Sequence, residues 1–128
     1  MSDSSLKGSK SERSYTKAIG FSEGLLSDMP LRVAVIADTP DFIALNKQAN
    51  ISIRQHPWDD NQPNLDFALN HQLKEGKQEI NALKAKLFGS VYFYEKAIAG
   101  VALFSKNKES LAFLRNAFGS GLMEFHFL

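Results

Sequence analysis

Two kinds of apolar repeat lie next to each other in the second half of the chain. From residue 65 to residue 87, leucine and isoleucine recur at spacings of three, four and seven, which is the period of one face of an amphipathic helix. Residues 91–94 and 98–104 are two short apolar runs typical of β-strands, and they flank Glu95 and Lys96. A helical pattern followed at once by a hairpin pattern predicts a mixed α/β fold, a sheet with helices packed on it.

Single residues predict where these elements end. Gly76 should divide the helical stretch into two helices, because glycine costs about 1 kcal/mol in a helix interior relative to alanine. Gly89 is typical of the position just beyond a helix C-terminus. Glu95 and Lys96 differ from the Asn-Gly type of two-residue hairpin turn, so we expect a wider turn.

A strand and a capped helix are predicted in the first half of the chain. Residues 31–36 form a short run rich in β-branched side chains, which predicts a strand. Thr39 can cap free amides, Pro40 suits the first position of a helix, and Asp41 is favourable at the positive end of its dipole. These residues predict a helix over about 40–49.

The remaining elements complete a predicted order of β-α-(β)-α-β-β-α-β. Residues 51–53 are a brief optional strand. Residues 111–118 place leucine and phenylalanine on one helical face, ended by glycine at Gly119 and Gly121. Residues 123–128 alternate large apolar with polar side chains, which predicts a final strand.

With 128 residues the chain has room for one domain. Residues 1–17 have almost nothing to bury, so we expect a disordered polar tail. Residues 18–30 are expected to be a linker, with either a short helical turn or an edge segment. Residues 31–128 are expected to form the single α/β domain.

Composition excludes several classes of function. The formal charge of +1 gives no general attraction to nucleic acid, so a nucleic-acid partner is not expected. No apolar run approaches the roughly 18 residues that suggest a membrane span. The chain has no cysteine, hence no disulfide, thiolate nucleophile or cysteine zinc site, and this fits a cytoplasmic protein.

No metal is expected either. The three histidines are scattered without the His-x-x-x-His spacing of a metal site. Asp59, Asp60 and Asp66 lack the spacing of a calcium loop. Paired aspartates before a helix are more often caps than ligands.

The predicted order resembles the N-terminal half of the GNAT superfamily of acyl-CoA-dependent N-acetyltransferases. Residues 31–34, Leu-Arg-Val-Ala, are similar to that family's hydrophobic-Arg-x-Ala first strand, and Asp38 to the acidic residue that follows it. The positions similar to its first helix are Phe42, Leu45 and Ala49. Residues 91–104, with Ile-Ala-Gly-Val-Ala at 98–102, are similar to the family's second and third strands, in which an apolar core follows a charged turn. Residues 123–128 would then stand where its fourth strand begins.

The segment between these elements resembles one branch of the family. Pro57, Trp58 and Asp59, with Phe67 downstream, look like the Pro-Trp-Ser and later phenylalanine of the ribosomal-protein alanine acetyltransferases. The resemblance implies an acetyl-CoA-dependent N-acetyltransferase. It covers about residues 31–128.

One departure from the family concerns the cofactor. In the family, the fourth strand leads into Arg/Gln-x-x-Gly-x-Gly/Ala, whose amides at a helix N-terminus hold the pyrophosphate. No such motif occurs here, and residues 119–121, Gly-Ser-Gly, precede a predicted strand. By comparison with the family, the chain is a truncated or catalytically degenerate relative, and no cofactor-binding residue can be assigned.

Four residues are candidates for a site. Glu124 and His126 are two apart on a predicted strand and so share a face, where a carboxylate near an imidazole favours general-base chemistry. The simpler interpretation is that both face solvent. His56 and Trp58 could line a substrate-binding loop, although such a tryptophan more often anchors a loop to the core.

The alternative function is a small non-catalytic α/β binding or regulatory module that acts through protein–protein contacts. Its polar tail or its apolar final strand would dock on a partner. An apolar strand at 123–128 is an aggregation risk unless something pairs with it. We therefore expect a homodimer, or a protein partner, through this strand, and the sequence leaves open whether the chain is an enzyme.

Overall fold

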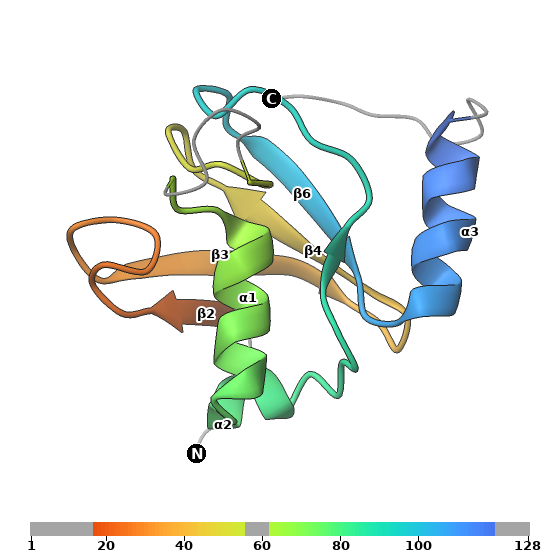
Figure 1. Cartoon of the computed structure of the whole chain (residues 1–128), viewed down its shortest axis with the longest axis horizontal. Helices are drawn as coiled ribbons and strands as arrows, with labels where there is room; N and C mark the ends of the chain where they lie inside the picture. The colour runs from red at the N-terminus through yellow and green to blue at the C-terminus, as the bar shows by residue number, and fades with distance from the viewer. Residues whose placement is uncertain (1–16, 56–61, 120–128) are drawn as a thin grey trace, which may run out of the picture.

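The computed structural model describes residues 17–55 and 62–119 (Figure 1). Three predictions lie outside these ranges. They are the disordered tail apart from Lys17, the candidate loop residues His56 and Trp58, and the final strand 123–128 with its candidate residues Glu124 and His126. Lys17 itself is described, and its carbonyl accepts from the Val35 N–H at 2.7 Å.

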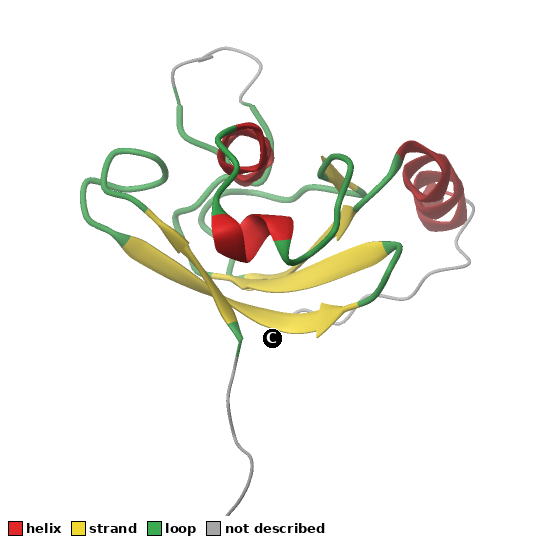
Figure 2. Cartoon of the chain, turned by 90° about the horizontal axis from the view of Figure 1, so that it is seen from below, coloured by secondary structure: helices red, strands yellow, loops and turns green. Residues whose placement is uncertain are grey.

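The described chain is a mixed α/β fold built on an antiparallel sheet. Its elements in order are β2 (Ala18–Phe21), β3 (Leu31–Asp38), β4 (Phe42–Lys47), α1 (Leu65–Lys74), α2 (Gln78–Asn81), β5 (Gly89–Ser90), β6 (Gly100–Ser105) and α3 (Lys108–Gly119). The strands lie in the order β2-β3-β4-β6-β5, and every neighbouring pair is antiparallel. Figure 2 shows α1 and α2 over one face of the sheet, while α3 stands to one side.

The core lies between the sheet and α1. Alternate residues of each strand point to the same face, so Val33 and Val35 of β3 and Ile43 and Leu45 of β4 turn inward together. The largest apolar side chains that are fully buried are Phe21, Val33, Ile43, Leu45, Ile53, Leu65, Leu69, Ile80 and Phe104. This one core joins segments from Phe21 to Phe104, and burying each large side chain contributes about 1.5–3 kcal/mol.

The predicted helix over 40–49 is wrong, because this segment is strand β4. Phe42 donates its N–H to the Thr39 hydroxyl at 3.0 Å, and the Thr39 N–H donates to the Phe42 carbonyl at 2.9 Å. These bonds close a tight turn that returns the chain along β3, where Val35 pairs with Leu45. The cap residues were identified correctly, but they cap a hairpin turn. The positions that resembled the first helix of the acetyltransferase family therefore have no helix.

The break at Gly76 is confirmed. Gly76 has φ +75°, the left-handed region that favours glycine. Helix α1 begins at the N-cap Asn64, whose side chain accepts from the Phe67 N–H at 2.8 Å. Helix α2 is a single short turn ending at Asn81.

The prediction that Gly89 ends a helix is wrong, because Gly89 belongs to β5. A Cβ atom at this position would lie 2.6 Å from the Leu111 side chain of α3. Glycine is therefore needed here for the close approach of α3 to the sheet.

The predicted hairpin is only partly correct, because its second run contains strand β6 but its predicted first strand, 91–94, is not formed and β6 pairs instead with β5. Its paired residues are Gly89 and Ser90, opposite Ser105 and Phe104 of β6. Residues 91–94 continue past β5 without forming a strand, and the turn before β6 is wider than two residues, as expected. The optional strand 51–53 is reduced to one bridge between Ser52 and Asn64.

Two predictions at the ends of the described chain have clear outcomes. Of the alternatives for residues 18–30, the edge segment is the one formed, because β2 is an edge strand of the sheet. The helix predicted over 111–118 is present as α3. Within residues 17–55 and 62–119, no helix is long and apolar enough to span a membrane.

Candidate ligand-binding pocket

The four candidate site residues from the sequence, His56, Trp58, Glu124 and His126, all lie outside the described residues. The structure therefore brings none of them together. Gln55 and Gln62, which border the 56–61 segment, are described and line the largest of three cavities. This cavity is the candidate site.

The site is built on the outer edge of β5, which is closed by side chains from α1. The Asn70 side-chain amide donates to the Phe88 carbonyl at 2.7 Å, and its oxygen accepts from the Phe88 N–H at 2.9 Å. Asp66 accepts from the Ser90 N–H at 3.0 Å and from the Ser90 hydroxyl at 2.9 Å. The two side chains thus take the place of a neighbouring strand.

Two arginines meet at the same serine. Ser90 is completely buried, and its carbonyl accepts from Nη2 of Arg54 at 3.1 Å and from Nη2 of Arg115 at 2.8 Å. Arg54 also donates from Nε to the Ser90 hydroxyl at 2.7 Å. Arg54 follows the buried Ile53, whereas Arg115 comes from α3. The positions of both guanidinium groups are therefore fixed by one residue of the sheet edge.

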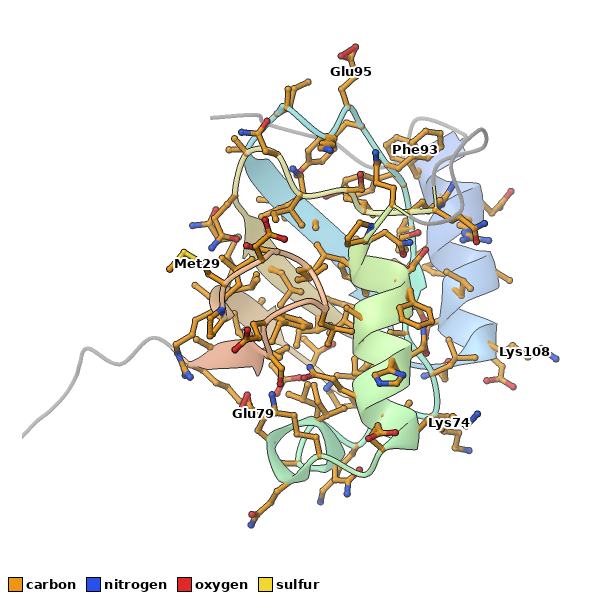
Figure 3. The ribbon with its side chains drawn as sticks, turned by 60° about the vertical axis from the view of Figure 1, so that its left-hand side comes forward. Met29, Lys74, Glu79, Phe93, Glu95 and Lys108 are labelled. Carbon is orange, nitrogen blue, oxygen red and sulfur yellow. The ribbon has the colours of Figure 1, made fainter. Side chains whose placement is uncertain are left out.

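Phe93 fixes the Arg54 side chain from a second direction. The centre of its ring lies 4.7 Å from the Arg54 guanidinium carbon, within the range of a cation–π contact. Phe93 is 64% exposed, although its ring is large and apolar. Figure 3 shows Phe93 and Glu95 at the end of the molecule where α1 begins, away from Lys74 and Glu79.

The cluster carries more positive than negative charge. Two guanidinium groups lie beside one carboxylate, that of Asp66. Both described side-chain hydrogen bonds of Asp66 are accepted from Ser90. A guanidinium has five N–H donors. In the described ranges, Nη1 of Arg54 and Nη1 of Arg115 have no acceptor. The cluster therefore has donors to offer to an anion.

Burial and neighbouring charge shift two pKa values in this cluster. Burial raises the pKa of Asp66, against the hydrogen bonds from Ser90 and the charges of both arginines, which lower it. Burial, with the nearby Arg115, lowers the pKa of Arg54. An arginine still remains charged at neutral pH. The Arg54 cation is thus partly desolvated, which strengthens its attraction for an anion.

Arg54 lines a cavity of about 890 Å³, which we call the Arg54 pocket. It is lined by residues 50, 52–55 and 93–97 and by Gln62. Its lining is mainly apolar, from Ile53, Phe93, Tyr94 and Ala97. This size and composition are typical of a small-molecule site, in which apolar walls surround a few fixed polar groups.

Lys47 lies behind the pocket wall and is almost fully buried. Its Nζ donates to the carbonyls of Gln48 at 2.9 Å and Lys96 at 3.1 Å, and lies 5.3 Å from the centre of the Tyr94 ring. Burial lowers the pKa of Lys47 and raises that of Tyr94 to about 12. In the described part of the chain Lys47 forms no ion pair with a carboxylate. It adds positive charge near the pocket.

Two other cavities are smaller than the Arg54 pocket. One, of about 470 Å³, is a shallow hollow beside the loop that contains Gly24. The second, of about 600 Å³, is lined by the end of α1 and by residues 22–25 of the loop after β2, and Gln72 there has a buried amide nitrogen without a described partner. No group of three or more metal-ligating side chains occurs within residues 17–55 and 62–119.

The sequence did not reveal this site. Asp66 was weighed as a cation ligand, and its described partner is instead Ser90. Arg54 and Arg115 lie 36 and 25 residues from Ser90, so no local motif joins them. The only local signal was an arginine directly after an apolar segment that ends at Ile53.

No protein-family model matches the chain, and no curated protein matches it significantly.

Proposed function

We propose that this protein is a small non-catalytic binding module whose Arg54 pocket takes an organic anion with an apolar body. The observation that carries the proposal is the Arg54 guanidinium, fixed by Ser90 and Phe93 at the wall of a mainly apolar cavity. We place this binding in the cytoplasm, which the lack of cysteine suggests.

Charge argues for an anion. Among the residues that line the pocket, Arg54 and Lys96 outnumber Glu95, so the described lining carries a positive excess. The described lining has one carboxylate, Glu95, which is exposed. A monoanion such as a carboxylate would neutralise the excess and accept charge-assisted hydrogen bonds from Nη1 of Arg54, which has no acceptor among the described residues.

The shape of the pocket argues for an apolar body. Ile53, Phe93, Tyr94 and Ala97 present apolar surface to the cavity. Burying a ring or a short alkyl chain there would remove apolar surface from water on both partners. A fixed arginine with apolar walls recognises both ends of such a ligand.

Thermal unfolding with matched ligands tests the proposal. Phenylacetate and hexanoate should raise the unfolding temperature, and the neutral phenylethanol and hexanol should raise it much less. Arg54→Gln should weaken phenylacetate binding by roughly tenfold or more, because a hydrogen bond to a charged group contributes about 1.5–3 kcal/mol. Arg32→Gln, which removes an exposed arginine outside the pocket, is the control.

Equal effects of the acid and the alcohol would contradict the proposal. So would an equal loss of binding in the two arginine variants. Either result would mean that Arg54 does not recognise the anion.

The second candidate function is the acyl-CoA-dependent N-acetyltransferase that the sequence resemblance implies. The observation in its favour is that residues 31–34 and 98–102, which resemble two strands of that family, lie in or adjoin strands of one sheet, β3 and β6. Acetyl-CoA in the same unfolding assay separates the two candidates. Stabilisation by acetyl-CoA that is undiminished in Arg54→Gln would favour the acetyltransferase and count against the Arg54 pocket.

A further inference from the structure

Lys47 occupies a position in strand β4 that suits an apolar side chain. Alternate residues of a strand share a face, and Lys47 follows Ile43 and Leu45 on the buried face of β4. Only 1% of Lys47 is exposed. Taking an ammonium group out of water is costly unless a partner compensates it, and no carboxylate of the described residues pairs with Lys47. The reason for a lysine here must lie in the other contacts of its Nζ.

These contacts lead to one wall of the Arg54 pocket. Besides the neighbouring Gln48 carbonyl, the Nζ donates to the Lys96 carbonyl at 3.1 Å, and it lies 5.3 Å from the centre of the Tyr94 ring. Tyr94 and Lys96 both line the pocket, whereas Lys47 is not among the lining residues. Lys47 therefore holds two residues of the wall without being part of the wall itself.

The wall segment that Lys47 contacts lacks the hydrogen-bond ladder of a regular element. Residues 93–97 lie between β5 and β6 and belong to neither a strand nor a helix. Their backbone is joined to the chain after β4 at the Lys96 carbonyl, which accepts from the Asn50 N–H at 2.7 Å. The Arg54 guanidinium lies over the Phe93 ring at the other end of the segment. Side chains thus do much of the work of fixing this wall.

We propose that Lys47 is a positioning residue of the Arg54 pocket, which fixes the wall segment 93–97 and so determines ligand affinity without touching the ligand. The inference rests on the proposed function, because it concerns the affinity of this pocket for an organic anion with an apolar body. A wall that is fixed before the ligand arrives does not have to be ordered on binding, and the saved entropy appears as affinity. The cost of burying the lysine is then offset at the pocket.

The proposal predicts that affinity and stability respond differently to Lys47→Met. The Lys96 carbonyl keeps its bond from Asn50, and an apolar side chain fills the buried position, so the unfolding temperature should change little. Phenylacetate should bind roughly tenfold more weakly, about the loss expected when one hydrogen bond to a charged group is missing. The amide NMR signals of residues 93–97 in the ligand-free variant should broaden, because the wall is less well fixed.

Lys106→Met is the matched control. Lys106 is a second buried lysine, 3% exposed, whose Nζ donates to Asp38 and to the Leu83 carbonyl at 2.8 Å. None of these three residues lines the Arg54 pocket. This variant should lower the unfolding temperature, because Asp38 loses a cation. Its dissociation constant for phenylacetate should stay within about twofold of the wild-type value, as expected for a distant and independent site.

Calorimetric titration of the folded full-length wild type, Lys47→Met, Lys106→Met and Arg54→Gln with phenylacetate measures these dissociation constants. Binding that is weakened in Lys47→Met and in Arg54→Gln but not in Lys106→Met supports the proposal. If Lys47→Met binds as tightly as the wild type while Arg54→Gln binds weakly, the role of Lys47 is overturned and the proposed function stands. If the wild type does not bind phenylacetate, both fail.

A second variant covers the case in which Lys47→Met does not fold. Lys47→Leu removes the same contacts with a different apolar shape, and it should show the same loss of affinity. If neither variant folds, the proposal is overturned as well, because Lys47 would then be required for the fold itself.

Discussion

Asp38 illustrates how one carboxylate can tie distant parts of this chain together. It accepts a close hydrogen bond from the buried Lys106 and another from Lys17 at 2.9 Å. Burial acts to raise the pKa of Asp38, but the hydrogen bonds and charges of the two lysines outweigh it, so the net pKa is lowered. Asp66 has the opposite net shift, because there burial prevails.

Asp38→Asn should lower the free energy of unfolding at neutral pH by about 1–3 kcal/mol, because the buried Lys106 loses its anionic partner. A carboxyl with a lowered folded pKa contributes stability above its ordinary pKa of 3.8, and this contribution is lost as the pH falls through the folded pKa. The difference between wild type and variant should therefore shrink in acid.

Urea unfolding at neutral and acid pH measures this difference. Asp28→Asn, at an exposed loop position, is the matched control and should change stability little. A deficit in Asp38→Asn that stays constant into acid would contradict the assigned pKa shift.

At the scale of elements, side chains close both edges of the sheet. Asn70 and Asp66 close the β5 edge. At the β2 edge the Gly20 N–H donates to Glu79 at 2.9 Å, and Lys77 donates closely to the Gly20 carbonyl. The unpaired N–H and C=O groups of an edge strand can form hydrogen bonds with a strand of another chain. Helices α1 and α2 thus protect the edges as well as cover the core.

Asn70→Ala should expose the β5 edge. We expect a loss of about 1–3 kcal/mol in the free energy of unfolding, because the Phe88 N–H and carbonyl both lose their partner. Self-association should also increase with concentration. Denaturant unfolding and light scattering measure the two effects.

His71→Ala, at the neighbouring exposed position of α1, serves as the control and should change stability by no more than about 0.5 kcal/mol. An Asn70→Ala variant as stable and as monodisperse as this control would show that the edge cap is unimportant.

Elements with a local signal could be predicted from the sequence, and those set by distant contacts could not. Gly76 marks a helix break through its own backbone preference, and the apolar face of 111–118 marks α3. Thr39, Pro40 and Asp41 led to the wrong prediction of a helix over 40–49. The reason is that the same side-chain hydrogen bond can cap the start of a helix or a tight hairpin turn. The arrangement at Ser90 depends on residues from three separate segments. Only the folded chain brings them together.

At the scale of the whole molecule, the Arg54 pocket lies at the end where α1 begins, away from Lys74 and Glu79 (Figure 3). It is the largest of the three cavities described above, and its lining combines a fixed guanidinium with apolar surface.

The most direct test of the account is an NMR titration of the isotope-enriched protein with phenylacetate. The Nε–H signal of Arg54 and the amides of residues 50–55 and 93–97 should shift together and saturate with one affinity. Signals around Gly24 and around α2, near the other cavities, should stay in place. Shifts confined to those other regions, or none at millimolar ligand, would contradict the claim that this protein binds organic anions through Arg54.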